Sequence, residues 1–278
     1  MKYFFVLLPL LAACSGTKEN KLKQVATLTL KEVSGLEYVG NTLWALEDSG
    51  NKNKIYKIAP DGSIAESVTV PQKNIDWEDI AADSEGNLYI GDFGNNENDR
   101  KNLVIYKLAS NKPDSVAYST SFNYPDQTEF PPKKSQLFFD VEAFIEFNGN
   151  FYLFTKNRSK GFDGTVTIYK VPNAPGTHTA VKLGTIATCD NYHRCAITGA
   201  DISSDGKKVV LLSGDKVWLL TDFGSGDFAK AKVTELNLGH HSQKEGICFK
   251  EDNNTLLIAD EKDKGIGGKL YEVKLSDL

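Results

Sequence analysis

Residues 34–50 read SGLEYVGNTLWALEDSG and contain two short apolar segments separated by a Gly-Asn turn. Each segment has the length of a β-strand, and the residues between them are typical of a tight turn. The second segment ends in Glu47 and Asp48, and a third strand-like segment with a tyrosine follows at 55–58. We therefore take this unit of strand, turn, acidic-ended strand and tyrosine strand as the basis of the fold.

The unit recurs five times, with copies that start near residues 35, 78, 142, 199 and 245. Further strand-like segments separate the copies at 67–70, 117–120, 181–186 and 232–236. Four strands per repeat are typical of a propeller blade. The last copy lacks a fourth strand, whereas residues 24–30 precede the first copy without a repeat of their own. The sequence thus predicts an all-β fold, a five-bladed β-propeller whose N-terminal strand closes the ring.

A sixth, degenerate blade is the alternative, and residues 124–140 are the place for it. Pro125, Pro131 and Pro132 argue against interior strands in that segment. We interpret it as a long loop on one face of the propeller, and long ordered loops often carry function.

The composition excludes several classes of protein. The chain of 278 residues has 32 Lys and Arg against 37 Asp and Glu, a net charge of −5, and no basic cluster that could neutralise a row of phosphates. Nucleic acid is therefore not an expected partner, and we expect a monomer. Beyond residue 13 no apolar segment approaches the roughly 18 residues that cross a bilayer, which excludes a polytopic membrane protein.

The N-terminus has the features of an export signal. One lysine precedes an apolar stretch at 4–11, and Leu11-Ala12-Ala13-Cys14 resembles the bacterial lipobox, in which the cysteine is acylated. An ordinary signal peptide with an incidental cysteine is the alternative. We predict a lipoprotein signal peptide at 1–13, a lipidated tether at 14–22 and a single propeller domain at 23–278. The lipid on Cys14 would hold the protein at the cell envelope, and the lack of Asp after Cys14 favours the outer membrane.

Two cysteines flank a polar loop. Outside the cytoplasm, Cys189 and Cys195 can close a small disulfide loop. A zinc site that uses both sulfurs and His193 is the alternative, although no second ligand cluster accompanies it. Cys248 lies in an apolar strand and is expected to be a buried, small hydrophobic residue.

The propeller fold brings two sets of polar residues together. In a propeller the first strand of each blade lines a central channel, and the second strand returns to the face at which the first one starts. Inner-strand starts and second-strand ends should therefore converge at one channel mouth. The candidate ligands for a metal or a polar molecule there are Glu78, Asp79, Asp92, Asn95, Asn96, Asp140, Glu142, Asp201, Glu245 and Asp260, and Asp48 and Asp215 end second strands in the same way.

Several carboxylates at one mouth repel one another unless a cation or a basic group balances them. One interpretation is a hard divalent cation, Ca²⁺, held by oxygens from different blades, with Glu78, Glu142 and Glu245 as the favoured ligands. The other is structural: acidic residues at strand entrances accept backbone N–H groups of a neighbouring blade and join the blades.

Basic and histidine side chains are the remaining candidates for ligand binding. Arg100 offers a planar fork for a carboxylate or phosphate, but it could equally pair with Asp92 or Asp99 in a capped turn. Lys156, Arg158 and His193 are further candidates, and His193 could move protons or simply anchor its loop.

The chain resembles a group of uncharacterised secreted bacterial β-propeller lipoproteins over most of its mature length. The resemblance rests on Asp76–Ala81, Leu88–Asn96, Asp140–Ala143, Ile197–Asp201 and Gln243–Ile247. It is similar, more distantly, to the SdiA-regulated and phytase-like esterase propellers. Those relatives imply a cation-bearing channel mouth and, for some, ester or lactone hydrolysis; the first group implies no activity, and fold alone does not transfer one.

Two functions follow as hypotheses, and whether the protein is an enzyme stays open. The first is a lipid-anchored extracytoplasmic binding or scaffold module that recognises a polar ligand, glycan or protein at the channel mouth. The alternative is a calcium-dependent hydrolase of esters, lactones or phosphoesters, in which the metal polarises an oxygen and Glu142 or His193 manages protons. The sequence favours binding because it contains no motif of a nucleophile and its base.

Overall fold

The computed structural model describes residues 21–109, 112–263 and 265–278. In it the strands assemble into five blades, each built on four antiparallel strands, which confirms the predicted five-bladed propeller. The first blade consists of β2 (Val33–Val39), β3 (Thr42–Glu47), β4 (Lys54–Ile58) and β5 (Ile64–Thr69). The second consists of β6 (Trp77–Ala82), β7 (Leu88–Asp92), β8 (Leu103–Ala109) and β9 (Lys112–Asn123), and the third of β10 (Asp140–Phe147), β11 (Asn150–Lys156), β12 (Thr165–Pro172) and β14 (Val181–Ala187). The fourth consists of β15 (Gly199–Ile202), β16 (Val209–Leu212), β17 (Lys216–Thr221) and β18 (Lys232–Asn237), and the fifth of β19 (Lys244–Phe249), β20 (Thr255–Asp260), β23 (Lys269–Lys274) and β1 (Lys23–Thr27).

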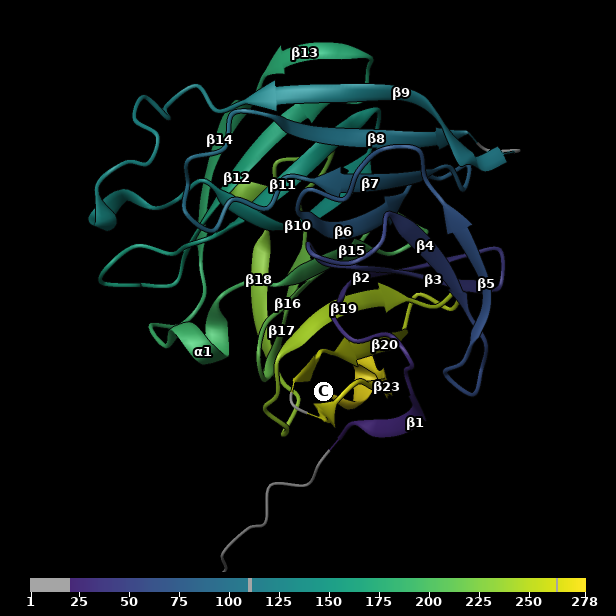
Figure 1. Cartoon of the computed structure of the whole chain (residues 1–278). Coiled ribbons are helices and arrows are strands. Elements are labelled where there is room, and N and C mark those ends of the chain that lie inside the picture. Colours follow the sequence, from purple (N-terminus) through teal and green to yellow (C-terminus); the bar gives the residue numbers. More distant parts are fainter. Residues whose placement is uncertain (1–20, 110–111, 264) are drawn as a thin grey trace, which may run out of the picture.

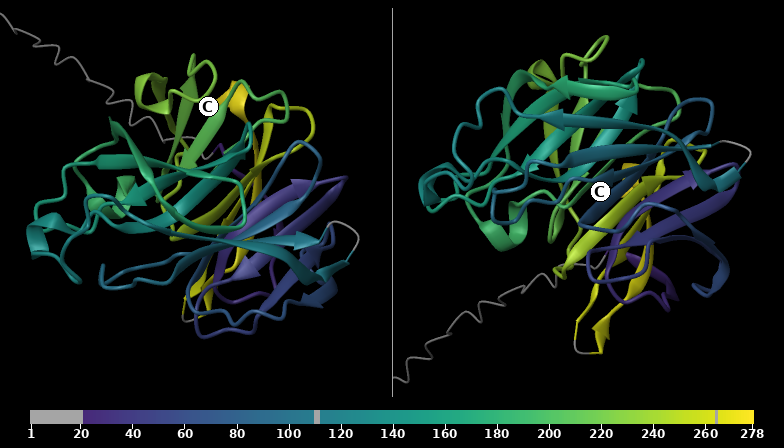
Figure 2. Two further views of the ribbon diagram at one scale, coloured as in Figure 1. Left: turned by 90° about the horizontal axis from the view of Figure 1, so that it is seen from above. Right: turned by 45° about the horizontal axis from the view of Figure 1, so that its top comes forward.

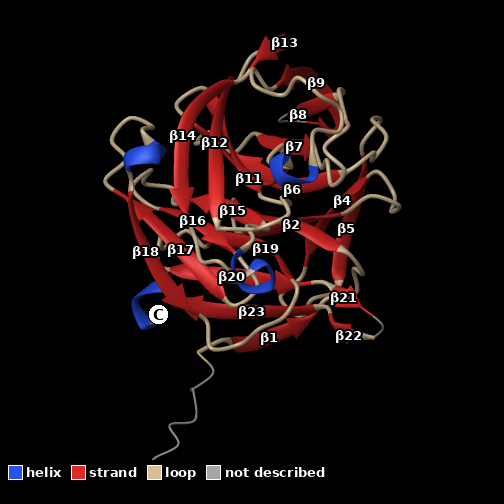
Figure 3. Cartoon of the chain, turned by 90° about the vertical axis from the view of Figure 1, so that its left-hand side faces the viewer, coloured by secondary structure: helices blue, strands red, loops and turns tan. Residues whose placement is uncertain are grey.

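The N-terminal strand closes the ring as predicted. β1 pairs antiparallel with β23 and supplies the outer strand of the fifth blade (Figure 1). The inner strands contact one another in a closed cycle of β2, β6, β10, β15 and β19. Figure 3 views the propeller approximately along its central axis and shows the blades arranged around these inner strands.

The core lies between neighbouring sheets, because the apolar residues of each sheet face the adjacent blade. The tyrosines of the third strands belong to it, as Tyr56, Tyr169 and Tyr271 are all buried. Two of them donate a hydrogen bond to the acidic residue at the end of the second strand, namely Tyr56 to Glu47 (2.9 Å) and Tyr271 to Asp260 (3.0 Å). In the first and fifth blades the tyrosine therefore joins the third strand to the second, whereas Tyr169 donates to Asp126 in the loop after β9 (2.8 Å).

The structure adds elements that the sequence analysis did not predict. β13 (Gly176–Thr179) pairs parallel with β9 and forms a fifth strand at the outer edge of the second blade. β21 (Lys262–Asp263) and β22 (Ile266–Gly267) form a small hairpin. The helical turns are α1 (Tyr192–Cys195), η1 (Lys134–Gln136), η2 (Phe228–Lys230) and η3 (Leu275–Asp277).

The segment proposed as the place for a sixth blade is a loop. Between β9 and β10 it contains only η1, so the proline argument holds. Both views in Figure 2 show this teal segment extending past the sheets at one side of the molecule.

The predicted signal peptide at 1–13 and Cys14 lie outside the described residues, as does most of the tether at 14–22. Within the described part of the chain, none of the helices has the length and apolar character required of a membrane span.

Candidate functional site

A β-bulge near the start of the first strand in four of the blades changes the direction of one side chain in each. The register of these first strands against their second strands skips one residue. A bulge leaves the extra residue unpaired and re-aims its side chain. The skipped residues are Ser34, Glu78, Glu142 and Glu245, and Thr198 holds the corresponding place just before β15.

These bulge residues play two roles. The hydroxyl groups donate to a backbone carbonyl of the next blade, Ser34 to Trp77 (2.9 Å) and Thr198 to Lys244 (2.5 Å). The three glutamates make no such contact and instead line the end of the channel. The repeat thus places carboxylates from three blades at one opening.

A cavity of about 470 Å³ lies at this end of the channel, and we call it the mouth cavity. Its wall combines the starts of first strands, the ends of second strands and the loop around α1, which is the convergence expected from the repeat. The candidates from the sequence that line it are Glu78, Asn96, Glu142, Lys156, Arg158, His193 and Glu245. Its volume suits a small polar molecule.

Negative charge concentrates at the side of the mouth cavity formed by the first two blades. Asp48, Asp76 and Glu78, here called the acidic triad, have carboxylate oxygens that all lie within 4.8 Å of one another. Burial, followed by the charge of Glu142 and other carboxylates, raises the pKa of Glu78 well above its usual value. Burial raises the pKa of Asp76 to about 6, although Arg100 Nη1 lies 3.8 Å from its Oδ2.

Glu78 is only 6% exposed, and no described residue donates a hydrogen bond to its carboxylate. A buried carboxylate without donors is costly unless a proton or a cation neutralises it. The acidic triad therefore has the oxygen donors, the spacing and the uncompensated charge that suit a hard divalent cation.

Positive charge lines the same cavity from the third blade, but it is already paired. Lys156 forms an ion pair with Glu142, and Arg158 Nη2 donates to Glu142 Oε1 at 2.5 Å. Arg158 also pairs with Asp140, which is fully buried behind it, and donates to the hydroxyl of Tyr192 at 3.0 Å. Burial lowers the pKa of Lys156, but the carboxylates of Glu142 and Glu245 outweigh it and hold that pKa above its usual value.

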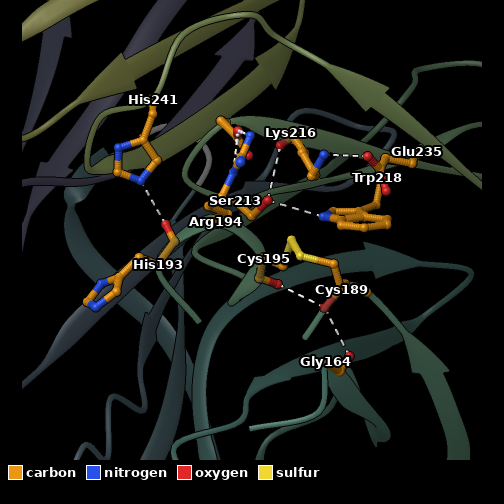
Figure 4. Close-up of a disulfide and its surroundings, with 12 residues drawn as sticks. Gly164, Cys189, His193, Arg194, Cys195, Ser213, Lys216, Trp218, Glu235 and His241 are labelled. Carbon is orange, nitrogen blue, oxygen red and sulfur yellow. Dashed lines mark hydrogen bonds and ion pairs between the residues drawn. A yellow bond between two sulfur atoms is a disulfide. The ribbon is translucent and has the colours of Figure 1, made fainter. Parts of the chain in front are cut away.

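The loop that carries α1 is closed by a disulfide between Cys189 and Cys195 (Figure 4). Both sulfurs are used in this bond, so the alternative zinc site with His193 does not form. The loop is also held from the fifth blade, because Nε2 of His241 lies 3.0 Å from the backbone oxygen of His193. Tyr192 and His193 are thereby fixed at the rim of the mouth cavity.

Three sequence candidates, Asp92 at the end of β7 and Asn95 and Arg100 in the loop after it, do not line the mouth cavity. Their prediction as ligand-binding residues is therefore wrong. Arg100 pairs with the buried Asp92 at 2.8 Å, so the capped-turn alternative describes it better than ligand binding. Asn95 is buried, and its backbone N–H donates to Asp140 at 2.7 Å, which joins the second blade to the third. Asn96 is the residue of this loop that lines the mouth cavity.

Asp260, predicted as a ligand of the channel mouth, is also placed elsewhere by the structure. Its side chain is buried and accepts hydrogen bonds from the backbone N–H of Lys269 (2.6 Å) and from Tyr271 (3.0 Å). These two contacts use both oxygens, so Asp260 stabilises its own blade and does not line the mouth cavity.

Asp79 and Asp201 lie inside the channel and fit the structural alternative. Asp79 accepts the backbone N–H of Phe144 in the third blade (3.2 Å), and Asp201 accepts that of Phe249 in the fifth (2.6 Å). Burial raises the pKa of both well above the usual value, and it raises the pKa of the neighbouring Glu37 to about 7. We call Asp79, Asp201 and Glu37 the channel acids. A second cavity of about 600 Å³ at the opposite end of the channel reaches Glu37 and Asp201.

The sequence analysis missed Asp76, Ser242 and Lys244, all of which belong to this end of the channel. Lys244 had a detectable signal, because it stands where the other copies of the repeat have a buried apolar residue. Those residues are Val33, Trp77, Val141 and Ile197. Ser242 lies in an irregular loop, for which the repeat offers no equivalent.

No protein-family model matches the chain, and no curated protein sequence does either. Among solved structures, it is similar to virginiamycin B lyase from Staphylococcus aureus, with 16% identity, a TM-score of 0.43 and 87% of this chain covered. This chain spans 66% of the length of that lyase. It is similar also to a PQQ-bound aldose sugar dehydrogenase from Streptomyces coelicolor (11%, TM-score 0.48, 91% of this chain and 96% of that one) and to a gluconolactonase from Xanthomonas campestris (10%, TM-score 0.46, 91% and 89%). Likenesses this low carry no statement about activity.

Proposed function

We propose that the protein is an extracytoplasmic binding module, anchored at the bacterial envelope by lipid on Cys14, that recognises a polar ligand in the mouth cavity. The observation that carries the proposal is the cavity itself, which is lined by carboxylates from three blades and by the paired cations of the third. A glycan is the ligand class that this wall fits best, because sugar hydroxyls can donate to carboxylates and Tyr192 offers an aromatic face at the rim.

Glycan binding is tested by calorimetry or an immobilised glycan screen, with Glu245→Gln as the mouth variant. Glu245 lines the mouth cavity, is partly exposed, and makes no described hydrogen bond, so its carboxylate is free to accept one from a ligand. Its change to Gln should weaken binding at least about tenfold, which is 1.4 kcal/mol. Glu251→Gln, at the opposite end of the channel, is the matched control. Equal affinity in both variants would place the ligand elsewhere.

The anchor is tested separately. Cys14→Ser should remove metabolic palmitate labelling and shift the protein from the membrane fraction to the soluble extracytoplasmic fraction. Unchanged labelling and fractionation would contradict the lipid anchor without touching the binding proposal.

A second candidate function is favoured by the acidic triad. We propose that Asp48, Asp76 and Glu78 hold a divalent cation, Ca²⁺, as in the calcium-dependent hydrolase of the sequence hypothesis. When bound, such a cation would polarise an ester or phosphate oxygen of a ligand in the cavity. The cation would also neutralise Glu78, whose pKa is raised by burial and then by neighbouring carboxylates.

Calorimetric titration with CaCl₂ tests this candidate. Wild-type protein should bind one Ca²⁺ per chain and gain thermal stability, whereas Glu78→Gln should bind it at least about tenfold more weakly because one of three charged ligands is lost. Hydrolysis of aryl esters, lactones and phytate is then measured with and without a chelator. Calcium binding without turnover would leave the cation as a structural or ligand-bridging group.

A further inference from the structure

Lys244 is a fully buried lysine at the start of β19, where the other blades have apolar side chains. No described carboxylate lies within ion-pair distance of it. Its Nζ lies 3.1 Å from the oxygen of Gly214 and 2.9 Å from that of His240, and 2.8 Å from Ser242 Oγ. A residue that breaks the pattern of its repeat without an apparent gain in packing is a candidate for function.

The described residues that contact Nζ supply acceptors but no negative charge. As an ammonium, Lys244 donates to the two backbone carbonyls and to Ser242 Oγ. Once deprotonated, it keeps two N–H groups for the carbonyls and has a lone pair for the hydroxyl proton of Ser242. Burial lowers the pKa of Lys244 to about 8, while the charges of Asp260 and Asp215 oppose the change. The remaining titratable group in contact is His240, whose Nδ1 lies 3.2 Å from Nζ and whose own pKa is lowered by burial and by Lys244.

Ser242 connects this buried amine to the mouth cavity. Ser242 is partly exposed, Lys244 is fully buried, and both belong to the wall of the cavity. A serine in the wall of a ligand-sized cavity, with an amine 2.8 Å from its Oγ, has the arrangement of an activated nucleophile. Lys156 and Arg158 line the same cavity, where both are paired with Glu142.

We propose that Ser242 is a nucleophile activated by Lys244 and that the mouth cavity hydrolyses small polar carboxylic esters. This activity goes beyond ligand binding and needs no cation, so it stands or falls independently of the acidic triad.

The steps balance without another reactant except water. Ser242 gives its hydroxyl proton to the neutral Nζ of Lys244 as Oγ bonds to the acyl carbon. The tetrahedral intermediate then expels the alcohol, which takes the proton from Lys244 and leaves an acyl group on Ser242. A water molecule gives its proton to Lys244 as it attacks the acyl carbon, and Ser242 recovers that proton when its bond to the acyl group breaks. The net reaction is ester and water to acid and alcohol.

The first test uses a fluorophosphonate probe, which labels an activated serine without requiring the natural substrate. The full-length protein is incubated with the probe at pH 6 to 9, digested and mapped by mass spectrometry. We expect label on Ser242 at a rate that rises with pH to a plateau near pH 9, because the amine must be deprotonated. Absence of label on Ser242 over this range would overturn the proposal.

The second test measures p-nitrophenyl acetate hydrolysis in variants. Ser242→Ala and Lys244→Met should each lower kcat/KM at least about 100-fold, whereas Ser204→Ala, in an exposed turn far from Lys244 along the channel, should leave it unchanged. An excess of chelator should leave wild-type turnover unchanged. Turnover retained in Ser242→Ala would refute the nucleophile.

Lys244→Met could fail to fold, so a thiol variant tests the base without removing it. In Ser242→Cys the neighbouring amine should lower the thiol pKa, so that alkylation by iodoacetamide reaches its half-maximal rate at a lower pH than in the control Ser204→Cys. The same alkylation profile in both variants would show that Lys244 does not activate residue 242.

Discussion

The residues that decide the chemistry of the channel mouth are carboxylates set in unequal surroundings. Glu142 and Asp140 are neutralised by Lys156 and Arg158, whereas the charges that act most strongly on Glu78 are those of other carboxylates. The net charge of the chain therefore says little about the mouth. What matters is that one side of the cavity is balanced internally and the other is left for a proton, a cation or a ligand.

Arg158 should contribute measurably to stability, because it pairs with two buried carboxylates. Arg158→Met leaves the fully buried Asp140 and the carboxylate of Glu142 without this partner. Breaking a buried ion pair by removing one member typically costs about 3 kcal/mol, so the free energy of unfolding should fall by about that amount in urea titrations. Lys230→Met, which removes an exposed ion pair with Asp227, is the control and should leave the free energy of unfolding nearly unchanged. Equal losses in the two variants would contradict the importance of the buried pair.

At the scale of elements, the loop that holds α1 depends on its disulfide. Changing Cys189 and Cys195 together to alanine should lower the free energy of unfolding by about 2 kcal/mol, since the bond closes a short loop in the unfolded chain. Tyr192 should also lose its fixed place beside Arg158, and binding at the rim should weaken. Urea titration and ligand calorimetry check both effects. A reductant should destabilise the wild type but not the double variant.

The N-terminal strand β1 should be required for a stable ring, because it is the outer strand of the fifth blade. A chain that starts at Leu28 lacks β1 and exposes the edge of β23. Unpaired edges promote aggregation and loss of cooperative unfolding, so this truncation should unfold at a lower temperature and aggregate, as seen by thermal unfolding and size-exclusion chromatography. A chain that starts at Lys21 keeps β1 and serves as the control. Identical melting curves would mean that β1 is dispensable.

At the scale of the whole molecule, the buried acids should make stability fall as pH rises. Burial raises the pKa of Glu37 to about 7, of Asp76 to about 6 and of Glu245 to about 8, so the folded state holds protons that the unfolded state has released. The resulting loss of stability develops between about pH 4.5 and 8 and reaches its full size above that range. We expect the free energy of unfolding in the presence of a chelator to drop from pH 5.5 to 8.5, with about 2 kcal/mol of the drop from Glu37 alone.

Urea titrations across this pH range measure the effect, and Glu37→Gln is the informative variant. It removes one of the groups with a raised pKa, so its profile should be flatter than that of the wild type. A profile that rises with pH in the wild type would contradict the assignment.

The repeat made the propeller and its closure predictable, because hydrophobic periodicity and turn residues act locally and recur in every blade. It also made the mouth position of Glu78, Glu142 and Glu245 predictable. The partners of these residues were not predictable, since the pairing of Arg158 with Asp140 and the burial of Asn95 depend on contacts between blades. β13 was missed for the same reason, as its parallel pairing with β9 joins segments of two different repeats.

The two ends of the described chain meet on the fifth blade, where Nζ of Lys21 donates to the backbone oxygen of Leu278 at 2.9 Å. A short peptide could therefore join them, and new ends could be opened in a surface turn between other blades. Such a circular permutant would keep every sheet while changing the order in which the blades are synthesised. In such a permutant β1 would follow β23 directly in the chain, so the fifth blade would form from consecutive strands.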